Sequence, residues 1–176
     1  MSDTRKKLVV INFFPAFNDP TSGGEQRSLH LLRALAKRFE VHSISPTYEK
    51  TRDETVILDQ HLHEHRFTKN RDYEEWQWSF REASFPVSAP AYAFALASPL
   101  HVAMKARVQE LAQDADAIVL QHPAAWQVAK DIPGKPLFYL AHNCEFELAV
   151  NALASTEFTA AAAMLHQLEY LSLIHI

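Results

Sequence analysis

The feature that most constrains the fold is an alternation of short, β-rich apolar runs with longer helical segments along the chain. The run KLVVINFF, residues 7–14, is apolar almost throughout, as expected of a strand buried on both faces of a parallel sheet. EVHSIS, AIVLQ and LFYLA are three further short strand candidates. Strands that alternate with helices predict an α/β fold, a Rossmann-like parallel sheet with flanking helices.

The first helical segment follows a loop that contains proline and aspartate, and it runs from Arg27 to Phe39. Leu29, Leu32 and Ala36 recur on one stripe of this segment, which predicts a helix packed against the sheet. Its basic opposite face is also a candidate for peripheral contact with anionic lipid. Packing on the sheet explains the pattern more simply.

A second helix is predicted with Ser98 as its N-cap, Pro99 as its first helical residue and its end near Gln113. Its expected buried stripe consists of Leu100, Met104, Val108 and Leu111. A short helix is expected to open at Pro123, and the sequence IPGKP then predicts a turn. The alanine-rich residues 145–170 are predicted to be mainly helical.

The polar stretch between residues 49 and 85 gives weaker signals. HLHEHRF predicts an exposed strand, in which His61, His63 and His65 would lie on one face. Two such imidazoles can bind a metal, but the spacing fixes no carboxylate or cysteine partner. An exposed polar strand without a metal is therefore the preferred interpretation.

The aromatic sequence YEEWQWSF follows, and it predicts either a loop or a short helix. Trp76 and Trp78, flanked by Tyr73 and Phe80, are candidates for contact with a sugar or a lipid. Packing beneath a surface segment is the simpler interpretation of these four rings.

Composition disfavours several classes of function. A net charge of -4 provides no broad basic surface for nucleic acid, so no nucleic-acid partner is expected. Cys144 is the only cysteine, which rules out an internal disulfide and indicates a reducing compartment. The apolar run AYAFALASPL has about ten residues, whereas a membrane-spanning helix needs roughly 20. The sequence therefore predicts a cytoplasmic protein, with peripheral contact at the inner membrane face as an option.

Three turns follow predicted strands and carry the chemically distinctive residues. They are Thr21 to Arg27, Gln121 with His122, and the turn with His142, Asn143 and Glu145. In an open parallel sheet, ligands bind outside the carboxyl ends of the strands. We therefore expect these turns to converge on one ligand crevice.

The sequence SGGE within the first turn has two interpretations of equal weight. Gly23 and Gly24 at a helix N-terminus would let the backbone approach a phosphate or a polar sugar closely. Alternatively, Ser22 and Glu25 form a capping box that alone accounts for a stable helix start. A dinucleotide site is not expected, because the loop is long and lacks the spacing G-x-G-x-x-G.

The sequence from Leu8 to Pro46 resembles the opening of the N-terminal domain of family 4-like glycosyltransferases, which have the GT-B architecture of two Rossmann-like domains. DADAIVLQHP and PLFYLAHNCEFELA are similar to later parts of that domain. The likeness covers most of residues 7–50 and 97–170. It implies a nucleotide-sugar donor, a hydroxyl acceptor on a saccharide or lipid-linked saccharide, retention of configuration, and no cofactor or metal.

The resemblance also implies site residues. His142 matches a histidine near the transferred sugar and is the predicted catalytic residue. The implied substrate-binding residues are Gly23, Gly24, Arg27, His122, Asn143 and Glu145. Simpler roles stay open for several of them: a solvated helix face for Arg27, a polar residue before a proline for His122, and helix capping for Asn143.

The chain departs from the family because it has no paired-glutamate motif of the donor-binding half. We expect residues 1–170 to be an incomplete acceptor-side domain that is inactive alone. The final LSLIHI, residues 171–176, equals a translation of CTG TCT CTT ATA CAC ATC, which resembles a transposon-end sequencing adaptor. The alternative function is a non-catalytic Rossmann-like module that binds a sugar or nucleotide.

Overall fold

The computed structural model describes residues 5–16, 18–47, 52–82 and 89–141. This part contains a six-stranded sheet in the order β3-β4-β2-β1-β5-β6. The strands are β1 (Lys7–Ile11), β2 (Glu40–Thr47), β3 (Glu54–Asp59), β4 (Leu62–Thr68), β5 (Ala117–Leu120) and β6 (Leu137–Tyr139). All neighbouring strands are parallel except β3, which pairs with β4 in the antiparallel sense. The predicted α/β class with a Rossmann-like sheet is confirmed.

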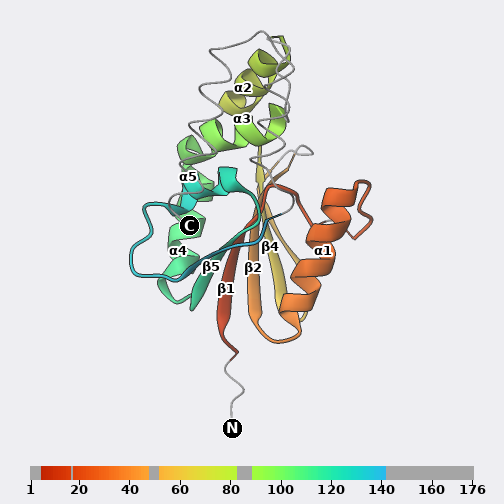
Figure 1. The fold of residues 1–176 in the computed structure, drawn as a ribbon, viewed down its shortest axis with the longest axis vertical. Helices are drawn as coiled ribbons and strands as arrows, with labels where there is room; N and C mark the ends of the chain where they lie inside the picture. The colour runs from red at the N-terminus through yellow and green to blue at the C-terminus, as the bar shows by residue number, and fades with distance from the viewer. Residues whose placement is uncertain (1–4, 17, 48–51, 83–88, 142–176) are drawn as a thin grey trace.

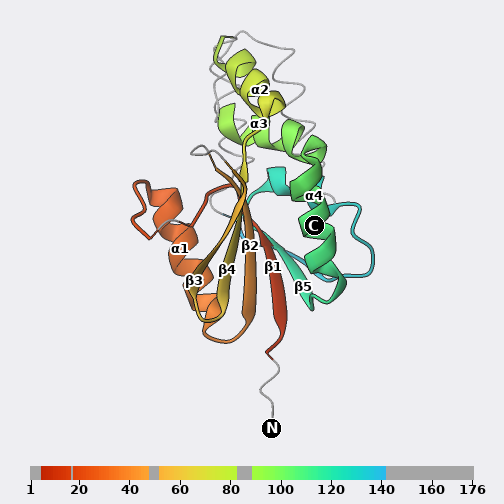
Figure 2. The ribbon, with the colours of Figure 1, turned by 180° about the vertical axis from the view of Figure 1, so that it is seen from behind.

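Helices cover both faces of this sheet, and two of them extend beyond the carboxyl ends of its strands. They are α1 (Gly23–Ala36), α2 (Arg71–Glu82), α3 (Ala89–Ala97), α4 (Val102–Gln113) and α5 (Trp126–Ala129), with 3₁₀ turns at Ser98–Leu100 and Pro123–Ala125. Figures 1 and 2 show α1 and α4 on opposite sides of the sheet. The α2 and α3 pair projects past the carboxyl ends of the strands (Figure 1).

Alternate residues of β1 divide the core into two layers. Val10 faces α1 and packs with its buried stripe of Leu29 and Leu32. Val9 and Ile11 point the other way, into the larger core with α3 and α4. Continuous burial of β1 on both faces explains why its sequence is apolar without alternation.

The helix predicted to begin at Ser98 begins later. Ser98 lies in a 3₁₀ turn, and its hydroxyl donates to the carbonyl oxygen of Phe94. His101 caps α4 instead, because its ring Nδ1 accepts the backbone N–H of Met104 at 3.3 Å. Leu100, predicted to be buried, is 59% exposed because it precedes the helix. The other three predicted stripe residues, Met104, Val108 and Leu111, are buried as expected.

The strand HLHEHRF is confirmed as β4, but the prediction that it is exposed is wrong. It lies between β2 and β3, and Glu64 and His65 on its two faces are buried. Strand β3, which the sequence analysis did not predict, supplies the antiparallel partner that covers its outer side. Polar composition concealed this burial, because the buried side chains are satisfied by partners far away in the sequence.

The aromatic sequence YEEWQWSF belongs to α2, so the helical alternative is confirmed. Tyr73 and Phe80 are buried, whereas Trp76 and Trp78 are 39% and 64% exposed. The two tryptophans therefore do not both pack beneath a surface segment, and whether they contact a sugar or lipid stays a prediction.

The remaining strand predictions agree with the structure. AIVLQ contains β5, the helical turns after Pro123 are present, and LFYLA contains β6. The IPGKP turn holds Gly134 at a φ of 71°, a left-handed conformation that favours glycine. The helix predicted over residues 145–170 lies outside the described residues. No helix within the described ranges is long and apolar enough to cross a membrane.

Candidate functional site

The carboxyl ends of β1, β5 and β6 lie side by side, and the start of α1 lies against them. Three polar side chains form a chain of hydrogen bonds beneath this edge. The amide Nδ2 of Asn12 donates to the hydroxyl of Ser28, which donates to Oε1 of Gln121 at 2.9 Å. All three residues are fully buried. This triad fixes α1 to the ends of β1 and β5, and it supports the predicted crevice from below.

The helix predicted from Arg27 to Phe39 is α1, which begins at Gly23 and ends at Ala36 instead. The capping box that the sequence offers at its start is confirmed. The hydroxyl of Ser22 accepts the amide of Glu25 at 3.2 Å, and the Glu25 carboxylate accepts the amides of Ser22 at 3.1 Å and Thr21 at 2.7 Å. Partial burial raises the pKa of Glu25, but the hydrogen bonds from Thr21 and Ser22 outweigh it and leave the pKa below its usual value. An ionised carboxylate therefore lies beside the glycine turn.

The two glycines have different surroundings. A Cβ on Gly24 would lie 2.9 Å from the ring of Phe14, which is too close for a real contact, whereas a Cβ on Gly23 would meet nothing within 4 Å. Packing against Phe14 accounts for Gly24 without any ligand. Gly23 faces open space, and within the described residues no acceptor is paired with its N–H or with that of Gly24. As the first two residues of α1, Gly23 and Gly24 carry N–H groups that a helix does not satisfy within itself.

Arg27 joins the first predicted turn to the segment that follows β6. Its guanidinium Nη2 donates to the carbonyl oxygen of Ala141 at 2.5 Å, although the two residues are 114 positions apart. Ala141 directly precedes His142 in the sequence. Arg27 is therefore not only a solvated residue of the helix face, which was the simpler interpretation, because its side chain also bonds a distant backbone carbonyl.

His122 follows β5 and caps the next turn. Its ring Nδ1 accepts the amide of Ala124 at 3.1 Å, and the ring centroid lies 5.5 Å from that of Phe13 after β1. The structure therefore gives His122 a capping role while placing it at the same edge as Asn12 and Gln121. The predicted residues His142, Asn143 and Glu145 lie outside the described residues, as does the tail 171–176.

Lys69 is a residue of this edge that the sequence analysis missed. It follows β4, is 8% exposed, and its Nζ lies 4.3 Å from the centroid of the Tyr73 ring. Burial lowers the pKa of this lysine to about 6. A lone lysine in a polar stretch gives no sequence signal of burial, because tertiary packing, including the Tyr73 ring of α2, removes it from water.

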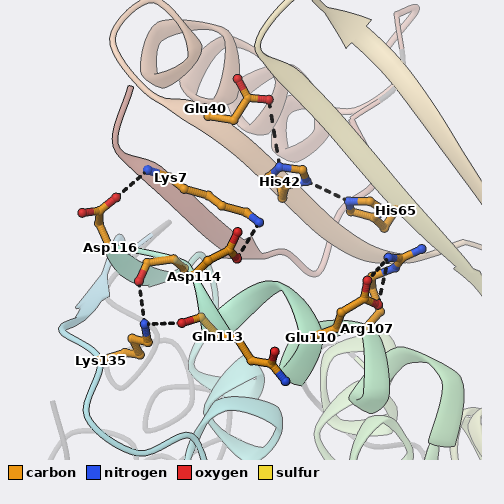
Figure 3. A network of polar contacts seen from close by, with 11 residues as sticks. Lys7, Glu40, His42, His65, Arg107, Glu110, Gln113, Asp114, Asp116 and Lys135 are labelled. Carbon is orange, nitrogen blue, oxygen red and sulfur yellow. Dashed lines mark hydrogen bonds and ion pairs between the residues drawn. The ribbon is translucent and has the colours of Figure 1, made fainter. Parts of the chain in front are cut away.

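Four histidines from β2, from β4 and from the turn before β4 lie towards the amino ends of these two strands: His42, His61, His63 and His65. The Glu40 carboxylate is 2.9 Å from Nδ1 of His61 and 2.9 Å from Nε2 of His63. His42 Nδ1 and His65 Nε2 are 3.1 Å apart (Figure 3). Within the described ranges no group of three or more His, Cys, Asp or Glu side chains is arranged to hold a metal ion.

Two of these histidines are neutral at physiological pH. Burial, the positive charge of Lys7 and the neighbouring His63 lower the pKa of His42 to about 4. Burial and then the nearby His42 lower the pKa of His65 to about 4. A neutral pair can share one N–H···N hydrogen bond, whereas two imidazolium rings at this distance would repel each other.

A groove of about 370 Å³ with a mixed polar and apolar lining lies beside this pair, between β4 and α4. Its lining includes Thr55, His65, Phe67, Arg107 and Glu110. Both arginines of the lining are paired with carboxylates: Arg107 with Glu110 at 2.9 Å (Figure 3) and Arg66 with Glu64 at 2.9 Å. The groove therefore offers no strong preference for a charged ligand, and the carboxyl edge is the better candidate site.

No family model matches the sequence, and no curated protein is significantly similar to it. Among solved structures, trehalose-6-phosphate synthase OtsA matches with a TM-score of 0.57 and 14% identity over 92% of this chain and 38% of that chain. The chain has a glycosyltransferase-like fold. An alpha,alpha-trehalose-phosphate synthase (UDP-forming) from Burkholderia vietnamiensis matches less well, with a TM-score of 0.43 and 14% identity over 93% and 37% of the two chains.

At such low identity the likeness to OtsA shows the fold alone. It supports the GT-B part of the sequence-based prediction but not the narrower family 4-like assignment. This glycosyltransferase-like chain spans about two fifths of the length of the synthase.

Proposed function

We propose that the chain is the acceptor-side, N-terminal Rossmann-like domain of a GT-B glycosyltransferase of the family 4-like kind. The parent enzyme transfers a sugar from a nucleotide-sugar donor to a hydroxyl of a saccharide or lipid-linked saccharide, with retention. The observation that carries this proposal is the hydrogen bond from Arg27 to Ala141, because it ties the glycine turn to the residue before His142. The fold shared with OtsA supports it.

In this proposal the glycine turn contacts the acceptor. The free N–H groups of Gly23 and Gly24 suit a sugar hydroxyl, and the Glu25 carboxylate beside them can accept one. The same negative charge disfavours a diphosphate at this position. We therefore assign the turn to a neutral acceptor in preference to the donor diphosphate.

The reaction needs little acid or base chemistry from this half of the enzyme. Glycosyl transfer is accelerated mainly by holding the acceptor hydroxyl and the donor in line and by stabilising the leaving diphosphate. We assign the orientation of the reacting sugar to His142 and a supporting role to Arg27. His122, Asn143 and Glu145 complete the proposed site.

A longer reading frame from the same source tests this proposal. We expect a second Rossmann-like half with paired glutamates, and sugar transfer by the longer protein when several nucleotide sugars are screened against saccharide acceptors by release of nucleoside diphosphate. A frame that ends naturally near Tyr170, together with binding but no transfer, would instead establish the non-catalytic binding module. Heat-inactivated protein serves as the control.

A further inference from the structure

Glu64, in the middle of β4, is a fully buried carboxylate. Its Oε1 accepts the backbone amide of Ala16 at 2.6 Å and the hydroxyl of Ser45 at 3.0 Å, and its Oε2 accepts Nε of Arg66 at 2.9 Å. Ala16 belongs to the loop that joins β1 to α1, so this contact spans 48 positions of the sequence. A residue of a polar strand thus holds the loop that leads to the glycine turn.

Arg66 completes the attachment. Its Nη2 donates to the carbonyl oxygen of Ala16 at 3.2 Å, while its Nη1 reaches Glu54 on β3 at 3.3 Å. Both backbone polar groups of Ala16 are therefore bonded by the Glu64 and Arg66 pair, as a neighbouring strand would bond them. We call this pair the loop clamp.

A buried ion pair such as the loop clamp is weak evidence of net stabilisation. Burial raises the pKa of Glu64, and the hydrogen bonds from Ala16, Arg66 and Ser45 only partly oppose that effect. Removing two charges from water offsets most of their attraction, so well-packed apolar residues of the same size often stabilise a fold as well. What apolar residues would not provide is a fixed hydrogen-bond geometry at Ala16.

The clamped residue is well placed to control the site. Ala16 is fully buried in the core layer that contains Leu29 and Leu32 of α1. Downstream of it, Ser22 caps α1 and Gly23 begins the helix. Ala16 therefore packs against the helix whose first residue is Gly23.

We propose that Glu64 and Arg66 are positioning residues that hold residues 12–16, the first described part of the loop after β1, in register with the sheet and so set the place of the Gly23–Gly24 turn. That this turn receives a sugar acceptor rests on the proposed function. The positional role does not, since it concerns the loop of the free chain.

Glu64→Gln is the direct test on the 176-residue chain. The glutamine side chain has only one acceptor oxygen. If this oxygen accepts the hydrogen bonds of Ala16 and Ser45, the NH₂ group faces the Nε–H of Arg66. Two donors then face each other, so the arginine must move. We expect amide hydrogen exchange in residues 12–16 and 18–24 to accelerate at least tenfold. Amides of β5 and α4 should keep their wild-type rates. The control is Glu54→Gln, which removes only the exposed partner of Arg66 and should leave the loop unchanged.

Unchanged exchange in the loop would overturn the proposal. So would a uniform acceleration that follows the loss of global stability measured in urea, because it would assign Glu64 a merely structural role. If Glu64→Gln does not fold, Arg66→Lys replaces it: lysine keeps the positive charge but lacks the planar fork that spans Glu64 and Ala16, and should loosen the same amides. The sugar-transfer assay of the longer protein tests the proposed function separately. The positioning role of Glu64 and Arg66 and the proposed function can therefore each be disproved without the other.

Discussion

Arg27 on α1 and Ala141 after β6 are joined by a side-chain to backbone hydrogen bond, which crosses the carboxyl edge of the sheet. The bond ties the first turn of α1 to the end of the described chain after β6. It also connects the two segments in which the sequence carries its most distinctive residues, the glycine turn and the turn that begins with His142. Such contacts can contribute to stability, to function or to both.

Arg27→Ala should affect function more than stability. Because Arg27 is exposed, we expect the melting temperature of the chain to fall by no more than about 4 °C, which corresponds to about 1 kcal/mol. In the longer protein, kcat/KM for sugar transfer should fall on the order of tenfold or more. Arg27→Lys is the matched variant. Full activity in the alanine variant would remove Arg27 from the site.

The two glycines should differ in their tolerance of a methyl group. Gly24→Ala pushes a Cβ into the Phe14 ring and should lower the free energy of unfolding by about 1 to 3 kcal/mol. Gly23→Ala adds its methyl to open space and should be neutral or stabilising by less than about 1 kcal/mol. Urea denaturation of both variants measures this. Adding Phe14→Leu to Gly24→Ala should recover part of the loss, and equal effects at the two positions would contradict the prediction.

Stability should fall in mild acid because of His42 and His65. The pKa of each ring is about 4 in the folded chain and 6.5 as the ordinary value, so the unfolded chain binds more protons between these pH values. The stabilisation is fully present above pH 6.5 and is lost as the pH falls towards 4. The free energy of unfolding should decrease by about 1.4 kcal/mol per pH unit for each such group, somewhat less for this coupled pair.

Replacing His42 with Gln tests this origin of the pH dependence. The variant should show a shallower slope of unfolding free energy between pH 6.5 and 4 than the wild-type chain. His30→Gln, an exposed histidine on α1, is the control and should leave the slope unchanged. Identical slopes in wild type and His42→Gln would assign the acid sensitivity to other groups.

His142→Ala should reduce turnover in the longer protein. A hydrogen bond that strengthens as the glycosidic bond breaks contributes more to the rate than to donor affinity. We expect kcat to fall on the order of tenfold to a thousandfold, which corresponds to about 1.4 to 4 kcal/mol. Turnover that stays normal while the melting temperature falls would make His142 a structural residue, and both measurements belong on one preparation.

The isolated 176-residue chain should not transfer sugar. The proposed donor-binding half is not in this sequence, so nucleotide sugar is not held against the acceptor side. Release of nucleoside diphosphate from several common nucleotide sugars should equal the rate without protein. Protein-dependent turnover by the purified chain would show that it holds a complete active site.

The buried parallel strands were predictable because a strand covered on both faces must be apolar without interruption, and KLVVINFF meets that condition on its own. The capping box was predictable for a similar reason. Ser22 and Glu25 are three residues apart, so their contacts are local and follow from the sequence alone.

The start of α4 and the environment of β4 were not predictable in this way. Ser98 satisfies its hydroxyl on Phe94, so the cap passes to His101, and this choice depends on the packing of α3. Strand β4 reads as exposed because its charged residues have no partner nearby in the sequence. Burial becomes possible only when β2, β3 and the β1–α1 loop surround it.

The sequence by itself determined the alternation of strands and helices and the capping box of Ser22 and Glu25, since each depends on neighbours within a few residues or on a general property of buried parallel strands. That the three polar turns meet at one edge stays a prediction, because His142, Asn143 and Glu145 lie outside the described residues. Only the tertiary structure decided that Gly24 is required by Phe14, that Arg27 reaches Ala141 and that Glu64 and Arg66 hold Ala16. These contacts join residues 10 to 114 positions apart, and no local pattern encodes a hydrogen bond or a steric limit whose partner arrives only when the chain folds.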